Sequence, residues 1–268
     1  MSKQRVLFVT QEMSPYTTLS EISSIVNQLA PYTYNNGYEV RVLMPRYGVI
    51  NERRHKLHEV VRLSGMNIIV DDDDFPLIIK VASLPGSRMQ VYFLDNEEFF
   101  KRKFIFDGED EQPFDDNADR MVFFCKGVME TVKKFGWAPD IIHCHGWMTS
   151  LIPMYHEKIY KQDPIFEEAK MIYSVYDGSY ANTFESTFFD KARINDLTEE
   201  DLSAYKAGDK IALHEGAITY SHALIAHTDI KEESVKKALK EVDTPQLSHN
   251  DETFLKEYLD FYKTLTNS

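Results

Sequence analysis

The chain has 268 residues, and 43% of them are hydrophobic, so it can bury a full core and is not expected to be disordered. Its 43 acidic residues outnumber 30 basic ones and give a net charge of -13, which opposes binding to nucleic acids or anionic membrane surfaces. With two cysteines and no run of about 20 apolar residues, we predict a cytoplasmic protein without a disulfide framework or a membrane span.

The beginning of the chain has the pattern of a β-α-β unit. Residues 6–10 form an apolar run typical of a buried strand, and residues 19–29 place apolar side chains at helical intervals. A second strand is predicted over 39–44, with a right-handed crossover. No glycine occurs between Val6 and Ala30, although the first loop of a nucleotide-binding α/β domain normally carries glycines. The segment therefore indicates a fold of the phosphate-binding type in which the loop that would contact the phosphate is altered.

Residues 60–95 change to three β-rich runs, over 60–70, 77–84 and 89–94. They predict a β-meander inserted between α/β units. The aspartates at 71–74 lie between the first two runs. A solvated turn is favoured there over a calcium site, because no glycine and distal glutamate follow at the spacing of a calcium-binding loop.

The rest of the chain alternates helices and strands, which favours a mostly parallel sheet with helices on both faces. We expect a Rossmann-like, doubly wound α/β fold with a β-rich insertion. One domain is predicted over 1–245, followed by a helical tail over 246–268 that packs back across it. Helices are predicted over 116–135, 149–160, 201–220, 230–242 and 251–265, and strands over 140–144, 170–176 and 223–227.

Residues that follow strands are the first candidates for a site, because open parallel sheets bind ligands beyond the carboxyl ends of their strands. His143 and His145 would face the same side of a strand, which allows metal ligation, a hydrogen-bonded pair, or a sugar contact with Trp147 as an apolar face. No nearby cysteine or carboxylate completes a metal set, so the hydrogen-bonded pair is favoured over metal, and no metal or cofactor is predicted. The candidates are Gln11, Glu12, Ser14 and residues 16–20; His143, His145 and Trp147; and Tyr176, Asp177 and Tyr180.

Ser20 is most simply the cap of the first helix, and Thr18 is an alternative cap. A catalytic serine is disfavoured because the sequence has no G-x-S-x-G elbow. Neither a Walker A motif nor a Rossmann glycine fingerprint occurs. No residue is therefore singled out as catalytic.

Six segments together resemble the N-terminal domain of bacterial glycogen and starch synthases. Each segment alone is weak, but their order and spacing agree with that family over about residues 3–240, and the combination is specific. The segments are residues 6–15, Val42 and Leu43 with P-R-Y-G at 45–48, V-Y-F-L-D-N at 91–96, Asp116 and Asn117 with Arg120, P-D-I-I-H-C-H-G-W at 139–147, and residues 223–228.

The resemblance implies a retaining glycosyltransferase of the GT-B type, which has two Rossmann-like domains and moves glucose from ADP-glucose to the nonreducing end of an α-1,4-glucan. In that family the N-terminal domain mainly holds the acceptor, and the C-terminal domain holds most of the nucleotide sugar. This chain is expected to be the N-terminal half only. Its expected partners are an α-glucan, ADP-glucose and a separate donor-binding chain, and we do not expect it to be active alone.

The resemblance also implies substrate-binding residues. The family places the equivalents of Asp116 and Asn117 in the cleft near the transferred sugar. His145 and Trp147 remain from a His-Asp-Trp segment whose aspartate is Gly146 here, and Tyr176 with Asp177 replaces a His-Asn pair. The substrate-binding residues implied are Asp116, Asn117, His145, Trp147 and Asp177.

The family's Lys-Thr-Gly-Gly loop, which approaches the ADP phosphates, is shortened here. Weak nucleotide contacts are assigned to Thr17, Thr18 and Ser20, and the phosphate-contacting lysine has no counterpart. Besides the acceptor half of a split enzyme, two hypotheses remain open. One is a non-catalytic glucan-binding or regulatory protein, and the other is a protein that docks a partner through surface that a second domain would cover.

Overall fold

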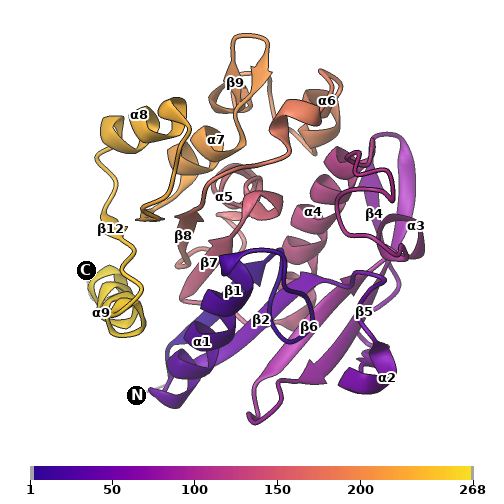
Figure 1. Cartoon of the computed structure of the whole chain (residues 1–268), viewed down its shortest axis with the longest axis vertical. Coiled ribbons are helices and arrows are strands. Elements are labelled where there is room, and N and C mark those ends of the chain that lie inside the picture. Colours follow the sequence, from indigo (N-terminus) through magenta and orange to yellow (C-terminus); the bar gives the residue numbers. More distant parts are fainter. Residues whose placement is uncertain (1–2, 267–268) are drawn as a thin grey trace.

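The computed structural model describes residues 3–266 and contains a large sheet with helices on both faces (Figure 1). Seven of its strands are parallel and lie in the order β12-β11-β8-β7-β1-β2-β6. The predicted doubly wound fold is confirmed. These strands are β1 (Arg5–Thr10), β2 (Glu39–Pro45), β6 (Gln90–Asp95), β7 (Ile141–His145), β8 (Lys170–Val175), β11 (Ala223–Ala226) and β12 (Gln246–Ser248).

The β-rich segment extends this sheet with antiparallel strands. β4 (Met66–Val70), β5 (Asp73–Ser83) and β6 form the predicted meander, and β3 (His58–Glu59) pairs with the other part of β5. The first predicted run, over 60–70, was too long, because residues 61–63 form a turn and β4 begins only at Met66. Because β6 also pairs with β2, the meander is continuous with the main sheet. Asp71 and Asp72 form a solvent-exposed turn, in which Asp71 has a φ of 57°, whereas the exposed Asp73 and Asp74 already belong to β5.

The helices begin and end at sequence signals. Ser20 caps α1 (Glu21–Asn35), since its hydroxyl accepts a hydrogen bond from the Ile22 amide, and Gly136 ends α4 (Asn117–Phe135) with a φ of 62°. None of the helices described within residues 3–266 is long and apolar enough to cross a membrane. The others are α2 (Glu52–His55), α3 (Glu97–Phe100), α5 (Ile152–Tyr155), α6 (Phe188–Ala192), α7 (Leu213–Tyr220), α8 (Glu233–Glu241) and α9 (Phe254–Thr266).

Two helix predictions were wrong in part. Residues 201–220 form a 3₁₀ turn (Ser203–Tyr205), a hairpin of β9 (Lys206–Ala207) and β10 (Lys210–Ile211), and only then α7. The turn residue Gly208 has a φ of 64°, which breaks a helix. Residues 147–160 are likewise divided into a 3₁₀ turn (Trp147–Thr149), α5 and a π-helical turn (His156–Tyr160). Further 3₁₀ structure covers Ala181–Thr183.

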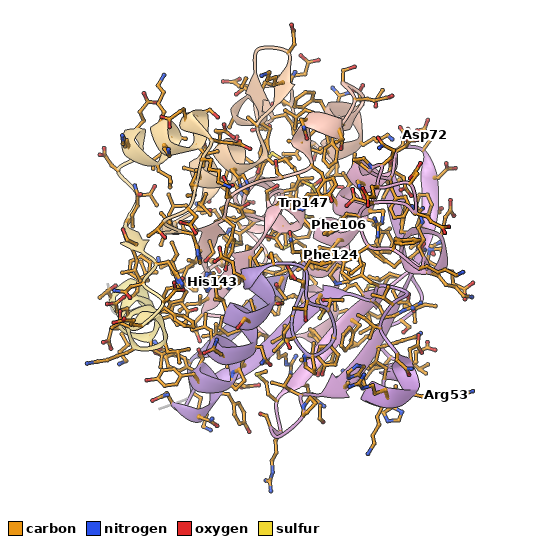
Figure 2. All side chains as sticks on the ribbon, in the orientation of Figure 1. Arg53, Asp72, Phe106, Phe124, His143 and Trp147 are labelled. Atoms are coloured by element: carbon orange, nitrogen blue, oxygen red, sulfur yellow. The ribbon has the colours of Figure 1, made fainter. Side chains whose placement is uncertain are left out.

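The C-terminal segment packs back on the domain, as predicted, but it also contributes β12, which the sequence did not indicate. α9 lies beside α1 and buries Phe254, Tyr258, Leu259 and Tyr262. The Tyr262 hydroxyl is 2.6 Å from Nδ1 of His143 in β7. Figure 2 shows His143 on the side of the sheet that α9 covers. The last helix is therefore part of the core packing.

Candidate substrate-binding cleft

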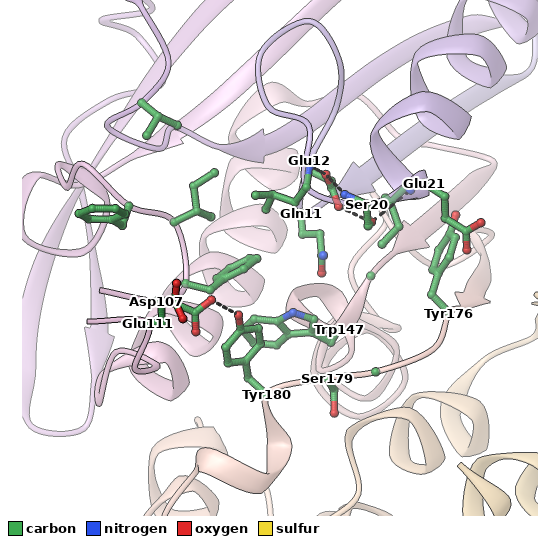
Figure 3. A pocket seen from close by; sticks show the side chains of 18 of the residues that line it. Gln11, Glu12, Ser20, Glu21, Asp107, Glu111, Trp147, Tyr176, Ser179 and Tyr180 are labelled. Atoms are coloured by element: carbon green, nitrogen blue, oxygen red, sulfur yellow. Dashed lines mark hydrogen bonds between the residues drawn. The ribbon is translucent and has the colours of Figure 1, made fainter. Parts of the chain in front are cut away.

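A cavity of about 1000 Å³ opens at the carboxyl ends of β1, β7 and β8 (Figure 3). The strand order reverses between β1 and β7, because the chain places β2 on one side of β1 and β7 on the other. Such a switch point leaves a crevice between the loops. The lining consists of Gln11, Glu12, residues 19–22, Val49, residues 103–109, Glu111, Gly146, Trp147 and residues 176–180.

An aromatic cluster forms one wall of the cavity. The ring centroids of Trp147 and Tyr180 are 5.2 Å apart, and Phe106 lies 4.9 Å from Trp147 and 5.3 Å from Tyr180. Trp147 is only 4% exposed, so the half-buried Tyr180 supplies more of the accessible aromatic surface. The Tyr180 hydroxyl donates a hydrogen bond to Asp107, which joins the two sides of the cleft (Figure 3). The predicted candidates Trp147 and Tyr180 therefore both line the cavity, together with Phe106, which the sequence did not single out.

His145 does not line the cavity. Its ring is fully buried, its Nδ1 is 2.8 Å from the Tyr176 hydroxyl, and its centroid is 3.9 Å from that of His143. Burial, and then the neighbouring His143, lower its pKa well below the usual value, so the ring is neutral near pH 7. Within residues 3–266 no group of three or more histidine, cysteine or acidic side chains is arranged to hold a metal ion.

Asp116 and Asn117 also lie outside the cavity lining. Asp116 pairs with Arg102, with 2.8 Å between Arg102 Nη1 and Oδ1 of the carboxylate. The Asn117 amide donates to the Phe106 carbonyl and accepts from Arg120. Both side chains thus position the 99–107 segment, which itself contributes to the lining; direct substrate contact by either residue remains a prediction.

The 99–107 segment is further fixed by two close approaches. Arg120 is fully buried and donates to the carbonyls of Phe99 and Ile105 at 2.8 and 2.6 Å. Gly48 donates its amide to the Phe100 carbonyl, and a Cβ at Gly48 would lie 2.2 Å from the Arg102 carbonyl oxygen. A side chain at position 48 would therefore displace this wall of the cleft.

The residues assigned weak nucleotide contacts surround the start of α1. Ser20 lines the cavity as the helix cap. Thr17 is buried, and its hydroxyl accepts a hydrogen bond from the Met13 amide; Thr18 is exposed, and neither threonine lines the cavity. The residue that binds this helix end is Glu12, to which sequence reasoning gave no role. The signal for it is a carboxylate two residues after a buried strand, in the loop that leads to the first helix.

Gly146, between His145 and Trp147, has a φ of 88°. A Cβ there would meet the side chain of Gln11, 2.3 Å from its Oε1 atom. Gln11 thus occupies the space beside Gly146, where a larger residue would clash with it. Figure 3 shows Gln11 extending toward Trp147.

Asp177 lines the cavity, as its predicted role in substrate binding requires, but its carboxylate already interacts with Lys231. It accepts a hydrogen bond from the Lys231 amide at 2.7 Å, and the Lys231 ammonium lies 3.4 Å away. The hydrogen bond from the Lys231 amide is the main cause of its lowered pKa. Whether Asp177 contacts substrate remains a prediction.

Comparison with known proteins agrees with this architecture. Residues 5–241 match the family model of the starch synthase catalytic domain. The chain is 36% identical to a glycogen synthase of Chlorobium limicola over 216 residues, which are 80% of this chain and 43% of that protein. It is 32% identical to a glycogen synthase of Chlorobaculum tepidum over 268 residues, which are 98% of this chain and 52% of that protein. The chain therefore spans about half the length of the curated relatives it matches.

One solved structure has the same fold. The catalytic domain of starch synthase IV from Arabidopsis thaliana, bound to ADP and acarbose, superposes with a TM-score of 0.73 at 18% identity. The superposition covers 98% of this chain and 50% of that one. The family model and the identity to the bacterial enzymes show that this chain belongs to the glycogen and starch synthase family of glycosyltransferases and corresponds to the N-terminal part of its catalytic domain.

Proposed function

We propose that this chain is the acceptor-binding half of a glucosyltransferase and holds an α-1,4-glucan in the cleft at the ends of β1, β7 and β8. The observation that carries the proposal is the cavity of about 1000 Å³, which joins an aromatic wall of Trp147, Tyr180 and Phe106 to several carboxylates. Aromatic rings stack on the apolar faces of sugars, and carboxylates accept hydrogen bonds from hydroxyl groups. The starch synthase IV domain, which has this fold, was solved with a sugar ligand, acarbose.

We propose that the donor, ADP-glucose, binds mainly to residues that are not among these 268. Those residues would belong to a separate chain or to the half of the related synthases that this chain does not cover. Departure of the diphosphate leaving group needs nearby positive charge to stabilise it. Removing one such stabilising group commonly lowers the reaction rate by a factor of about 10² to 10³. Among the described residues that line the cavity, Lys103 is the one basic side chain. Transfer by these residues alone is therefore not expected. The buried free thiols of Cys125 and Cys144 support a reducing, cytoplasmic location.

The proposal is tested by titrating the purified chain with maltoheptaose in a calorimeter. Saturable binding is expected, and Tyr180→Ala should weaken it about tenfold, because it removes the more accessible aromatic surface. Tyr34→Ala, at the far end of α1, is the matched control and should bind as the original chain does. Equal affinities for the Tyr180 variant and the original chain would contradict the proposed site.

A second candidate is a non-catalytic glucan-binding or regulatory protein. It is favoured by the same cavity together with the scarcity of positive charge around it. Mixing the chain with candidate donor-binding chains and labelled ADP-glucose separates the two functions. Incorporation of label into glycogen supports the acceptor half of an enzyme, whereas saturable glucan binding without transfer in any mixture supports the regulatory function.

A third candidate is docking of another protein at the cavity mouth. Leu19, Val49 and Phe104, each 41–50% exposed, surround that mouth. Light scattering after size-exclusion chromatography would separate a monomer from an assembly.

A further inference from the structure

The segment 176–180 follows β8 directly and forms one side of the cleft (Figure 3). All five of its residues line the cavity, and they include Tyr180, the main aromatic surface of the proposed sugar site. The segment belongs to no helix or strand. Its position is therefore fixed by contacts with neighbouring elements and not by the sheet itself.

Three residues of the segment are fixed through their own side chains. These contacts join Tyr176 to His145, Asp177 to the Lys231 amide, and Tyr180 to Asp107. Gly178 lies between them and has no side chain. Its φ is 78°, and a Cβ there would meet nothing within 4 Å, so the backbone turn requires the glycine and the space does not. Since glycine has the widest conformational freedom, Gly178 is where the segment could swing away from the cleft.

The backbone of Gly178 is bound from outside the cavity by His214, at the start of α7. Nε2 of His214 is 3.1 Å from the Gly178 carbonyl oxygen, and Nδ1 is 2.9 Å from the Tyr173 hydroxyl in β8. Burial lowers the pKa of His214, so its ring is neutral near pH 7. A carbonyl only accepts hydrogen bonds, so Nε2 carries the proton, and Nδ1 accepts from the Tyr173 hydroxyl. One tautomer therefore satisfies both partners.

We infer that His214 is a positioning residue for the cleft, because its Nε2–H binds the Gly178 carbonyl and thereby fixes the position of Tyr180. The Tyr173 hydroxyl selects the tautomer that makes this bond, so β8 and α7 together orient one side of the cleft. His214 does not line the cavity and acts only through Gly178. The inference rests on the proposed function for the identity of the ligand, and it extends that function to a residue behind the site.

The first test determines the tautomer of His214 in the original chain by ¹⁵N NMR near pH 7.5. We expect Nε2 to carry the proton. A proton on Nδ1 would mean that the ring donates to Tyr173 and cannot bind the Gly178 carbonyl, which would overturn the inference. This measurement needs neither a variant nor a glucan, so it decides even if a variant does not fold.

The second test divides the two hydrogen bonds between two variants. His214→Gln places its amide near the position of Nε2 and can still donate to Gly178, whereas His214→Asn places its amide near Nδ1 and reaches only Tyr173. In a calorimetric titration, the Kd for maltoheptaose should stay within about threefold in the Gln variant and rise at least about tenfold in the Asn variant. The same two changes at the exposed His58 are the control and should leave the Kd unchanged. Equal losses of affinity in both His214 variants would show a merely structural role and overturn the inference.

The third test separates failure of the inference from failure of the proposed function. Order parameters of the backbone amides of residues 178–180, from ¹⁵N relaxation without glucan, should fall in His214→Asn and stay unchanged in His214→Gln. Unchanged order parameters in the Asn variant would contradict the positioning role while glucan binding stands. If maltoheptaose does not bind the original chain, the proposed function is wrong, and the order parameters still decide whether His214 fixes the segment.

Discussion

At the scale of single residues, two neighbouring side chains, Gln11 and Glu12, complete the backbone around the cleft. Gly146 has no side chain, and Gln11 fills the space next to it. Glu12 satisfies the amides that open α1, in a loop that contains no glycine between Val6 and Ala30. The sequence allowed the altered loop to be predicted and named Glu12 as a candidate, but it did not predict that Glu12 binds the amides before α1, because a hydrogen bond between residues seven positions apart depends on how the loop folds.

Gly146→Ala is expected to lower the free energy of unfolding by about 2 kcal/mol, because alanine is strained at a φ of 88° and its Cβ meets Gln11. Urea denaturation measures the loss. In a Gln11→Ala background the same change should cost about 0.5–1 kcal/mol less, since the clash is removed and only the backbone strain remains. Identical costs in the two backgrounds would show that Gln11 does not restrict position 146.

At the scale of elements, the parallel strands other than β12 could be predicted because each is a short apolar run next to a helix signal. Residues 201–220 could not, because their apolar spacing fits a helix while the turn at Gly208 and the packing of Gly216 on Tyr205 decide the structure. The wall of the cleft at 99–107 is irregular and has no periodic signal. It is held by Arg120, whose pKa burial lowers to about 10.

Arg120→Met should remove about 3 kcal/mol of stability, because it leaves the buried carbonyls of Phe99 and Ile105 without their donor. Hydrogen exchange should rise over residues 99–107 more than in α4 as a whole. Arg193→Met, which loses only an exposed ion pair with Asp190, should change stability by less than about 0.5 kcal/mol. Unchanged exchange in the 99–107 segment would contradict its dependence on Arg120.

At the scale of the whole molecule, the sheet and the C-terminal helix enclose a group of buried histidines. Burial lowers the pKa of His143 to about 3 and that of His227 to about 2, and neighbouring histidines add to both shifts. The ring centroids of His227 and His249 are 4.1 Å apart, and His249 contacts Tyr258 of α9. The sequence placed His143 and His145 on one strand face, but it did not indicate that the tyrosines of α9 would pack on His143.

These histidines predict a loss of stability in acid. The folded state keeps His143 neutral down to about pH 3, whereas the unfolded chain binds a proton near pH 6.5, so stability falls as pH decreases between these values. Each such histidine contributes about 1.4 kcal/mol per pH unit. Urea denaturation at pH 7.5, 6 and 5 measures the effect. In folded His143→Gln the free energy of unfolding should decline less steeply with falling pH than in the original chain. In His58→Gln, where the histidine is exposed, the decline should be unchanged. A decline equally steep in the His143 variant would contradict this origin.

The central claim is that glucan binds in the cleft at the ends of β1, β7 and β8, and a crystal structure of the chain with saturating maltoheptaose tests it most directly. The account predicts density for glucosyl units against Tyr180, within hydrogen-bonding distance of the carboxylates that line the cavity, and with the Glu12 carboxylate still on the amides of Leu19 and Ser20. A cavity without sugar in crystals that hold maltoheptaose elsewhere on the surface would contradict it.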